Sequence, residues 1–161
     1  MKKRINKENL FVLTSFVMCF AFVGFVCMVL PAVKISSNAL SSASVKIDGI
    51  VAVFGGESKL NDLVLFNFKF NLLSLIGYLL PLVGCVLCYF AFKKLNLMLY
   101  YVTAVLCIVG GGLTLFESVI FRSINNISEV VNVSILLGPI IGGVSSILAG
   151  LVSIGSSQIF K

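Results

Sequence analysis

The chain has 161 residues, of which 59% are hydrophobic and only 11% are charged, with a formal net charge of +6. A soluble domain carries about 25% charged residues, so this composition excludes a soluble globule and indicates a protein surrounded by lipid. The basic residues are scattered at the ends of apolar segments, where they meet headgroups, so the positive charge does not indicate a nucleic-acid partner.

Four apolar segments are each long enough to cross a bilayer. A hydrocarbon core about 30 Å thick needs roughly 20 helical residues. The segments predict transmembrane helices at about 10–33, 70–92, 95–118 and 131–157. Because lipid cannot satisfy backbone polar groups, we interpret all four as helices of one domain, residues 1–161. The first segment is longer than a signal-peptide core and lacks a good cleavage site, so we interpret it as a retained anchor.

The region 34–69, between the first two helices, predicts a small antiparallel β-sheet. The stretches 33–36, 45–48 and 65–71 alternate apolar and polar residues, which is typical of half-buried strands, and 128–134 alternates weakly and could add an edge strand. The apolar stretch Gly49–Gly56 fits either a further strand or a short helix at the membrane interface, and the pattern leaves both open.

Basic residues predict the orientation of the chain. They precede the first helix, fill the short turn between the second and third helices and end the chain: Lys2, Lys3, Arg4, Lys7, Lys93, Lys94 and Lys161. Positive charge favours the cytoplasmic side, so both termini are expected in the cytoplasm and the loop 34–69 outside the cell membrane. The short turn also requires the two helices it joins to pack as antiparallel neighbours.

The third helix and its end carry two features with alternative interpretations. Gly110-Gly111-Gly112 fits a close helix crossing, which we favour, or an unwound stretch that binds an ion. Glu117 is the acid nearest a membrane segment, and an intramembrane carboxylate is a candidate proton or cation site. Glu117 lies about 20 residues beyond the short turn between the second and third helices, which places it at the outer headgroups, near Arg122. An interfacial role is therefore favoured over an ion or proton site.

The fourth helix carries a ridge of small residues, Gly138, Gly142, Ser146 and Gly150, at a spacing of four. In lipid, helices associate by close packing at such residues. We favour packing within the chain over self-association. A second small row is Ala149, Ser153 and Ser157.

Residues for chemistry are scarce. There is no histidine, and Cys85 and Cys88 alone cannot complete a zinc site, so we interpret these cysteines as small apolar side chains. The sequence has no phosphate loop and no nucleophile elbow. We therefore expect no enzyme activity, no metal and no cofactor.

The layout of the chain is a basic tail, a first helix ending in Leu30-Pro31-Ala32-Val33, a strand-rich loop with Gly-Ile-Val-Ala-Val-Phe-Gly, and three closely spaced helices. It resembles small uncharacterised four-helix membrane proteins of Gram-positive bacteria, over the whole chain and in layout only. It is also similar to the claudin-like tetraspan arrangement, in which an extracellular sheet crowns the bundle. The tryptophans and the cysteine pair of the claudin loop are missing here, so barrier function is not implied.

These observations predict a multi-pass membrane protein without catalytic activity. It would act by contact with another membrane protein or with itself, through the extracellular sheet and the small-residue helix faces. The alternative is an accessory subunit of a channel or transporter, with Glu117 near the outer end of the path.

Overall fold

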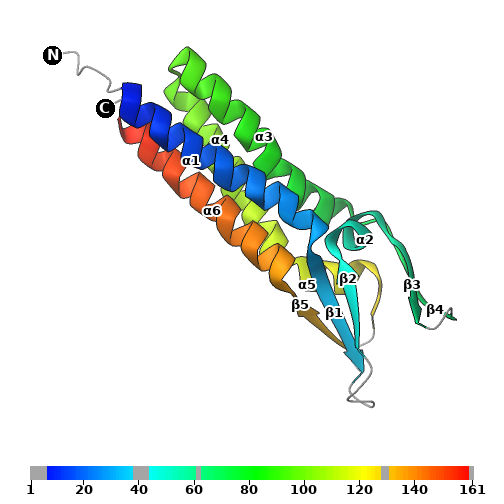
Figure 1. The fold of residues 1–161 in the computed structure, drawn as a ribbon. Coiled ribbons are helices and arrows are strands. Elements are labelled where there is room, and N and C mark those ends of the chain that lie inside the picture. Colours follow the sequence, from blue (N-terminus) through cyan, green and yellow to red (C-terminus); the bar gives the residue numbers. More distant parts are fainter. Residues whose placement is uncertain (1–6, 38–43, 61–62, 128–130, 160–161) are drawn as a thin grey trace.

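The computed structural model describes residues 7–37, 44–60, 63–127 and 131–159, and it consists of four long helices with short strands at one end (Figure 1). The long helices are α1 (Lys7–Val26), which the 3₁₀ turn η1 (Cys27–Val29) extends, α3 (Leu72–Lys94), α4 (Leu97–Leu115) and α6 (Leu137–Gln158). All four are long and apolar enough to cross a membrane, as expected of a membrane protein. Their outward apolar side chains, such as Phe16 and Val105, are more than half exposed, which suits a surface covered by lipid.

The helices form a four-membered bundle in which each packs on two others. α1 lies between α3 and α6, and α4 also lies between α3 and α6. One end of the bundle, here called the turn end, carries the start of α1, the end of α6 and the turn from α3 to α4 (Figure 1). The opposite end carries the strands and is called the sheet end.

The turn between α3 and α4 contains only Leu95 and Asn96. Leu95 takes the left-handed conformation with φ of 50°, which ends α3, and the Asn96 side chain accepts the amide of Met98 at 2.9 Å, which caps α4. The predicted antiparallel packing of these two helices is confirmed.

A small antiparallel sheet is present, as predicted. Three strands pair in the order β2 (Ser44–Asp48), β1 (Pro31–Ser37) and β5 (Val131–Ile135), so β1 is central. A separate hairpin pairs β3 (Gly56–Leu60) with β4 (Leu63–Phe68). The sequence did not predict β3.

The stretch left open between strand and helix forms α2 (Gly49–Phe54), which packs beside the start of α3. It ends at two glycines with positive φ, Gly55 at 79° and Gly56 at 147°. These angles are costly for any residue with a Cβ atom, so the glycines allow the chain to turn from α2 into β3.

Three predicted helix boundaries were wrong. The first helix ends before Pro31, because a residue preceding proline disfavours the helical conformation, and Leu30 is extended with ψ of 159°. Residues 31–33 therefore belong to β1. Residues 131–135 form β5, and α6 begins only at Leu137. The third helix breaks at Phe116 and is followed by a separate helix, α5 (Glu117–Ile124).

The sheet end has its own hydrophobic core beneath the strands. The rings of Phe68 and Phe121 contact each other with centroids 5.1 Å apart, and apolar side chains of β1 and β2 pack on them. Hydrogen bonds tie the segments together: the amide of Gly49 donates to the Leu30 carbonyl at 3.0 Å, and the amide of Leu136 donates to the Ala32 carbonyl at 2.8 Å.

Some predictions concern residues outside the described ranges. They include the basic residues Lys2, Lys3, Arg4 and Lys161, and residues 128–130 at the start of the weakly alternating stretch.

Candidate functional site

Most polar side chains inside the bundle bond to backbone carbonyls of the helices. Ser146 donates to the Gly142 carbonyl at 2.8 Å, and Ser153 on α6 donates to the Tyr100 carbonyl on α4 at 2.8 Å. The Thr14 hydroxyl donates to the Leu10 carbonyl at 2.8 Å, so the Tyr100 hydroxyl donates to Thr14 at 2.7 Å. The hydrogen-bonding capacity of these groups is used within the bundle, where it stabilises helix packing. Few polar side chains of the bundle therefore remain to bind a ligand or take part in a reaction.

Glu117 is different, because its carboxyl is completely buried at the sheet end of the bundle. α4 ends at Leu115, the chain turns at Phe116, and α5 begins with Glu117. This places the carboxyl beside the first turn of α3, where the Ser74 hydroxyl donates to Glu117 Oε1 at 2.7 Å.

One face of α3 supplies the polar neighbours. Asn71, Ser74 and Tyr78 are spaced three and four residues apart, so their side chains share a face. Asn71 caps the helix by accepting the Ser74 amide at 3.1 Å, and Tyr78 lies within electrostatic range of Glu117. All three side chains are fully buried. We call these three residues and Glu117 the Glu117 site.

Three atoms of the Glu117 site lack hydrogen-bond partners among the described residues: Glu117 Oε2, Asn71 Nδ2 and the Tyr78 hydroxyl. A buried polar atom without a partner costs roughly 1–3 kcal/mol, so three in one place need an explanation. A water molecule that enters the site can satisfy any of the three, whereas a proton or a small cation can bind only at the two oxygens, Glu117 Oε2 and the Tyr78 hydroxyl.

Burial also changes the acidity of Glu117, which follows the membrane-spanning part of α4. Removal from water disfavours the charged carboxylate, while the hydrogen bond from Ser74 favours it. The first effect is larger and raises the pKa of Glu117 to about 7. The carboxyl can therefore gain and lose a proton near neutral pH.

The structure does not bring Arg122 to this carboxyl. Arg122 lies near the end of α5, where its Nε donates to the Ile127 carbonyl at 3.4 Å, whereas Glu117 bonds to Ser74. Sequence reasoning missed Asn71, Ser74 and Tyr78. Their spacing in an otherwise apolar segment was the signal that could have revealed them.

The small residues of α6 pack inside the bundle. A Cβ atom on Gly138 would lie 2.9 Å from the Pro31 carbonyl oxygen, and one on Gly142 would lie 3.1 Å from that of Gly24 on α1. Ser146 contacts Gly24 of α1, and Gly150 faces Ala104 of α4. The ridge is therefore buried within the chain and offers no free face for self-association.

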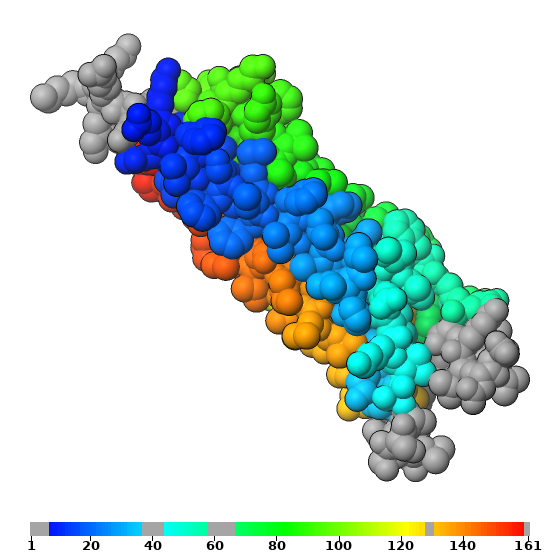
Figure 2. All heavy atoms as spheres, in the orientation of Figure 1, coloured from blue at the N-terminus to red at the C-terminus, as the bar shows by residue number. Residues whose placement is uncertain are grey.

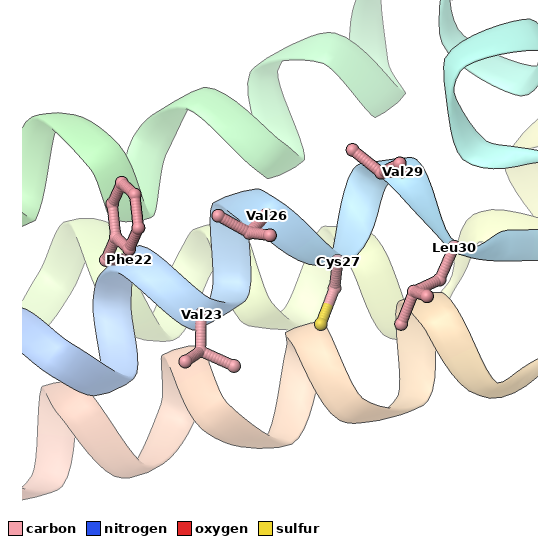
Figure 3. Close-up of a pocket in the computed structure, with 6 residues that line it drawn as sticks. All are labelled: Phe22, Val23, Val26, Cys27, Val29 and Leu30. Carbon is pink, nitrogen blue, oxygen red and sulfur yellow. The ribbon is translucent and has the colours of Figure 1, made fainter.

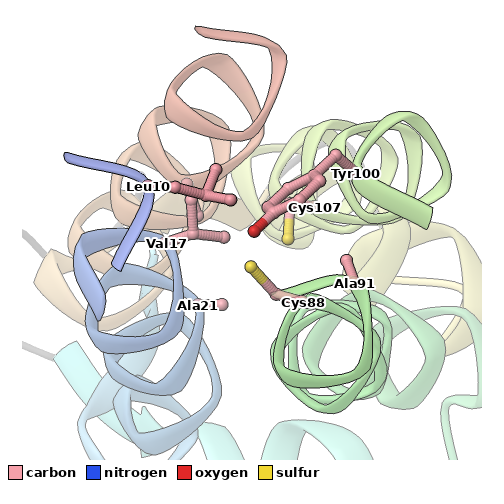
Figure 4. Close-up of a cluster of buried hydrophobic side chains, with 8 residues drawn as sticks. Leu10, Val17, Ala21, Cys88, Ala91, Tyr100 and Cys107 are labelled. Carbon is pink, nitrogen blue, oxygen red and sulfur yellow. The ribbon is translucent and has the colours of Figure 1, made fainter. Parts of the chain in front are cut away.

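Cys27, Cys88 and Cys107 are buried and Cys85 is partly buried, whereas Cys19 is exposed on the surface of the bundle. All five have free thiols, and those of Cys88 and Cys107 point into the bundle core near the Tyr100 hydroxyl (Figure 4). Cys85 donates to the Met18 carbonyl at 3.7 Å, a bond between α3 and α1. Across the described ranges, no group of three or more His, Cys, Asp or Glu residues could hold a metal ion.

No protein-family model matches this chain, and no curated protein matches it.

Proposed function

We propose that the chain is a multi-pass protein of the bacterial plasma membrane, without catalytic activity, that works by protein–protein contact at its sheet end. Both termini lie in the cytoplasm and the sheet end faces outside. Lys7, Lys93 and Lys94 at the turn end support this orientation, because basic residues favour the cytoplasmic side.

The observation that carries the proposal is the separately packed unit at the sheet end. Its strands rest on their own apolar core, in which Phe68, Phe121, Val33 and Ile47 are almost completely buried. The Asn125 side chain also accepts the amide of Lys69 at 2.8 Å, which links α5 to the segment after β4. A preformed surface loses little conformational entropy when a partner binds, so this unit suits recognition.

The surface available for contact is the polar face of the three-stranded sheet and its edges. Ser44, Asn132 and Ser134 are exposed on this face, opposite the buried apolar positions of the same strands. β2 and β5 are the edge strands, and an edge strand can pair with a strand of a partner. The small-residue ridge of α6 has no part in this proposal because α1 and α4 cover it.

Site-specific photo-crosslinking in intact cells tests the contact proposal. Crosslinking residues placed at Ser44 on β2 and at Asn132 on β5, both exposed, are expected to give the same discrete protein adduct. The matched control is Val105 on α4, which is 61% exposed on the apolar surface of the bundle and is expected to give no such adduct. No adduct from either strand, or the same adduct from all three positions, would contradict the proposal.

A second candidate function is supported by the unpartnered Oε2 of Glu117. In this alternative the chain is an accessory subunit of a channel or transporter, and Glu117 binds a proton or cation near the outer end of the path. Glu117 Oε2 and the Tyr78 hydroxyl are buried oxygens without hydrogen-bond partners among the described residues, and oxygen atoms are the ligands that protons and hard cations take.

Flux measurements distinguish this alternative from the contact function. Purified protein in liposomes is expected to pass protons or monovalent cations if the alternative holds, and Glu117→Gln is expected to abolish that flux because the amide cannot ionise. Glu57→Gln, an exposed carboxylate on β3, is the control and should keep the flux. The alternative fails if the wild-type protein passes nothing or if both variants behave alike.

A further inference from the structure

A hollow lies where the sheet joins the bundle, on the apolar surface of the molecule. It has a volume of about 220 Å³ and is lined by residues from the end of η1, the strands and the start of α6: Leu30, Pro31, Lys46, Leu136, Leu137 and Ile141. Figure 2 shows α1, the first strands and α6 meeting on one face of the molecule. Lys46 is the charged residue of this lining.

A second hollow continues along α1 away from the sheet. It has a volume of about 390 Å³ and shares Leu30 with the first. Figure 3 shows its lining residues spaced along the end of α1 and through η1, with Val23, Cys27 and Leu30 directed toward α6. Every lining residue of this second hollow is apolar. The two hollows together form a groove that is apolar along the bundle and basic at the sheet.

A second lysine stands beside the basic end. Lys34 on β1 is directly opposite Lys46 on β2 in the antiparallel register, so both side chains lie on the same face of the sheet. Like charges in opposed positions destabilise a sheet. Neither ammonium group forms a salt bridge with a described residue, although Asp48 follows Lys46 by two positions on the same strand.

Lys46 lies where the apolar spans end, which is where lipid headgroups are expected. Lys46 adjoins Leu30 and Leu137, which lie where the apolar spans of α1 and α6 reach the sheet. Lysine at such a boundary extends its ammonium toward lipid phosphates while its methylene groups cover apolar surface. An anion bound between Lys34 and Lys46 would also remove the repulsion between them.

We propose that this groove binds one anionic phospholipid from the leaflet at the sheet end. Its phosphate lies between Lys34 and Lys46, and an acyl chain follows Leu30, Cys27 and Val23 along α1. Lys34 and Lys46 lie on the same sheet face as Ser44 and Ser134. The lipid site does not depend on which side of the membrane the sheet occupies, and its test measures bound lipid, which does not require a protein partner.

Lipid retention by the full-length protein tests this site. Protein in mild detergent is exposed to phosphatidylglycerol or to phosphatidylcholine with the same acyl chains, and bound lipid is counted by native mass spectrometry. The wild type is expected to retain one phosphatidylglycerol and little phosphatidylcholine. Changing both Lys34 and Lys46 to glutamine is expected to lower phosphatidylglycerol retention about tenfold, since each lysine contributes attraction to an anionic headgroup.

Two matched controls separate a specific site from general attraction. Lys93→Gln with Lys94→Gln removes two adjacent lysines at the turn end and should leave retention unchanged. Ile141→Trp, which fills the hollow, should reduce retention. Leu151→Trp, at another exposed position further along α6 (54% exposed against 43% for Ile141), should not. Equal binding of the two lipids, or equal losses in both lysine pairs, would overturn the proposal.

Discussion

Replacing Glu117 with glutamine is expected to remove most of the pH dependence of the protein's stability. Burial raises the pKa of Glu117 from its ordinary 4.5 to about 7 in the folded protein. Below pH 4.5 the carboxyl is protonated in both the folded and unfolded states and contributes no pH dependence. As pH rises from 4.5 to 7, the unfolded state ionises first, so the free energy of unfolding falls by about 3 kcal/mol and stays low above pH 7.

Unfolding in detergent at a series of pH values between 4 and 8.5 measures this effect. The glutamine variant keeps an acceptor for the Ser74 hydroxyl but cannot ionise, so its curve is expected to be nearly flat. Glu57→Gln changes an exposed carboxylate on β3 and should reproduce the wild-type curve. If the wild type and Glu117→Gln lose stability in parallel as pH rises, the carboxyl is not buried as described.

Replacing Gly111 with alanine is expected to separate α4 from α6 and destabilise the bundle by about 1–3 kcal/mol, the usual cost of overpacking. A Cβ atom at Gly111 would lie 2.6 Å from the Gly143 carbonyl oxygen, a backbone atom that cannot move away without shifting α6. The next residue is the control, because a Cβ atom at Gly112 meets nothing within 4 Å. Gly112→Ala should leave stability unchanged or raise it by up to about 1 kcal/mol, the helix propensity gained.

The two variants are compared by thermal unfolding under identical detergent conditions. The pair also tests the two interpretations of the glycine run. α4 is helical throughout Leu97–Leu115. Gly110 faces Pro81 of α3 and Gly111 faces α6, so the two adjacent glycines allow close contact with two different helices. If Gly112→Ala were the more damaging change, the run would have a role other than close packing.

The four-helix architecture could be predicted from the sequence because hydropathy and length determine membrane segments almost alone. The sheet followed from the alternation in β1, β2 and β4, since one face of each strand is apolar. β3 was missed because Gly-Glu-Ser-Lys has no alternating pattern, and its position depends on pairing with β4. The early end of the first helix could have been inferred from Pro31, but the apolar residues that follow it hid the boundary.

The Glu117 site was only partly predictable. Counting residues along the third helix located Glu117 near one end of the bundle, but its burial depends on the turn at Phe116 and on α5 packing beneath the sheet. Burial by segments that are distant in the sequence produces no periodic pattern in the sequence itself. The partners on α3 come from a segment more than forty positions away, as the Ser74–Glu117 bond shows with its separation of 43 residues.

The junctions between the sheet and the bundle have a mechanical consequence. Leu30 alone joins η1 to β1, and Leu136 alone joins β5 to α6, while β1 pairs with β5 and α1 packs on α6. The packed helices α1 and α6 are thus continued by the paired strands β1 and β5, and each linker is a single residue. A pull or twist applied to the strands would therefore be transmitted along α1 and α6 to the turn end of the bundle.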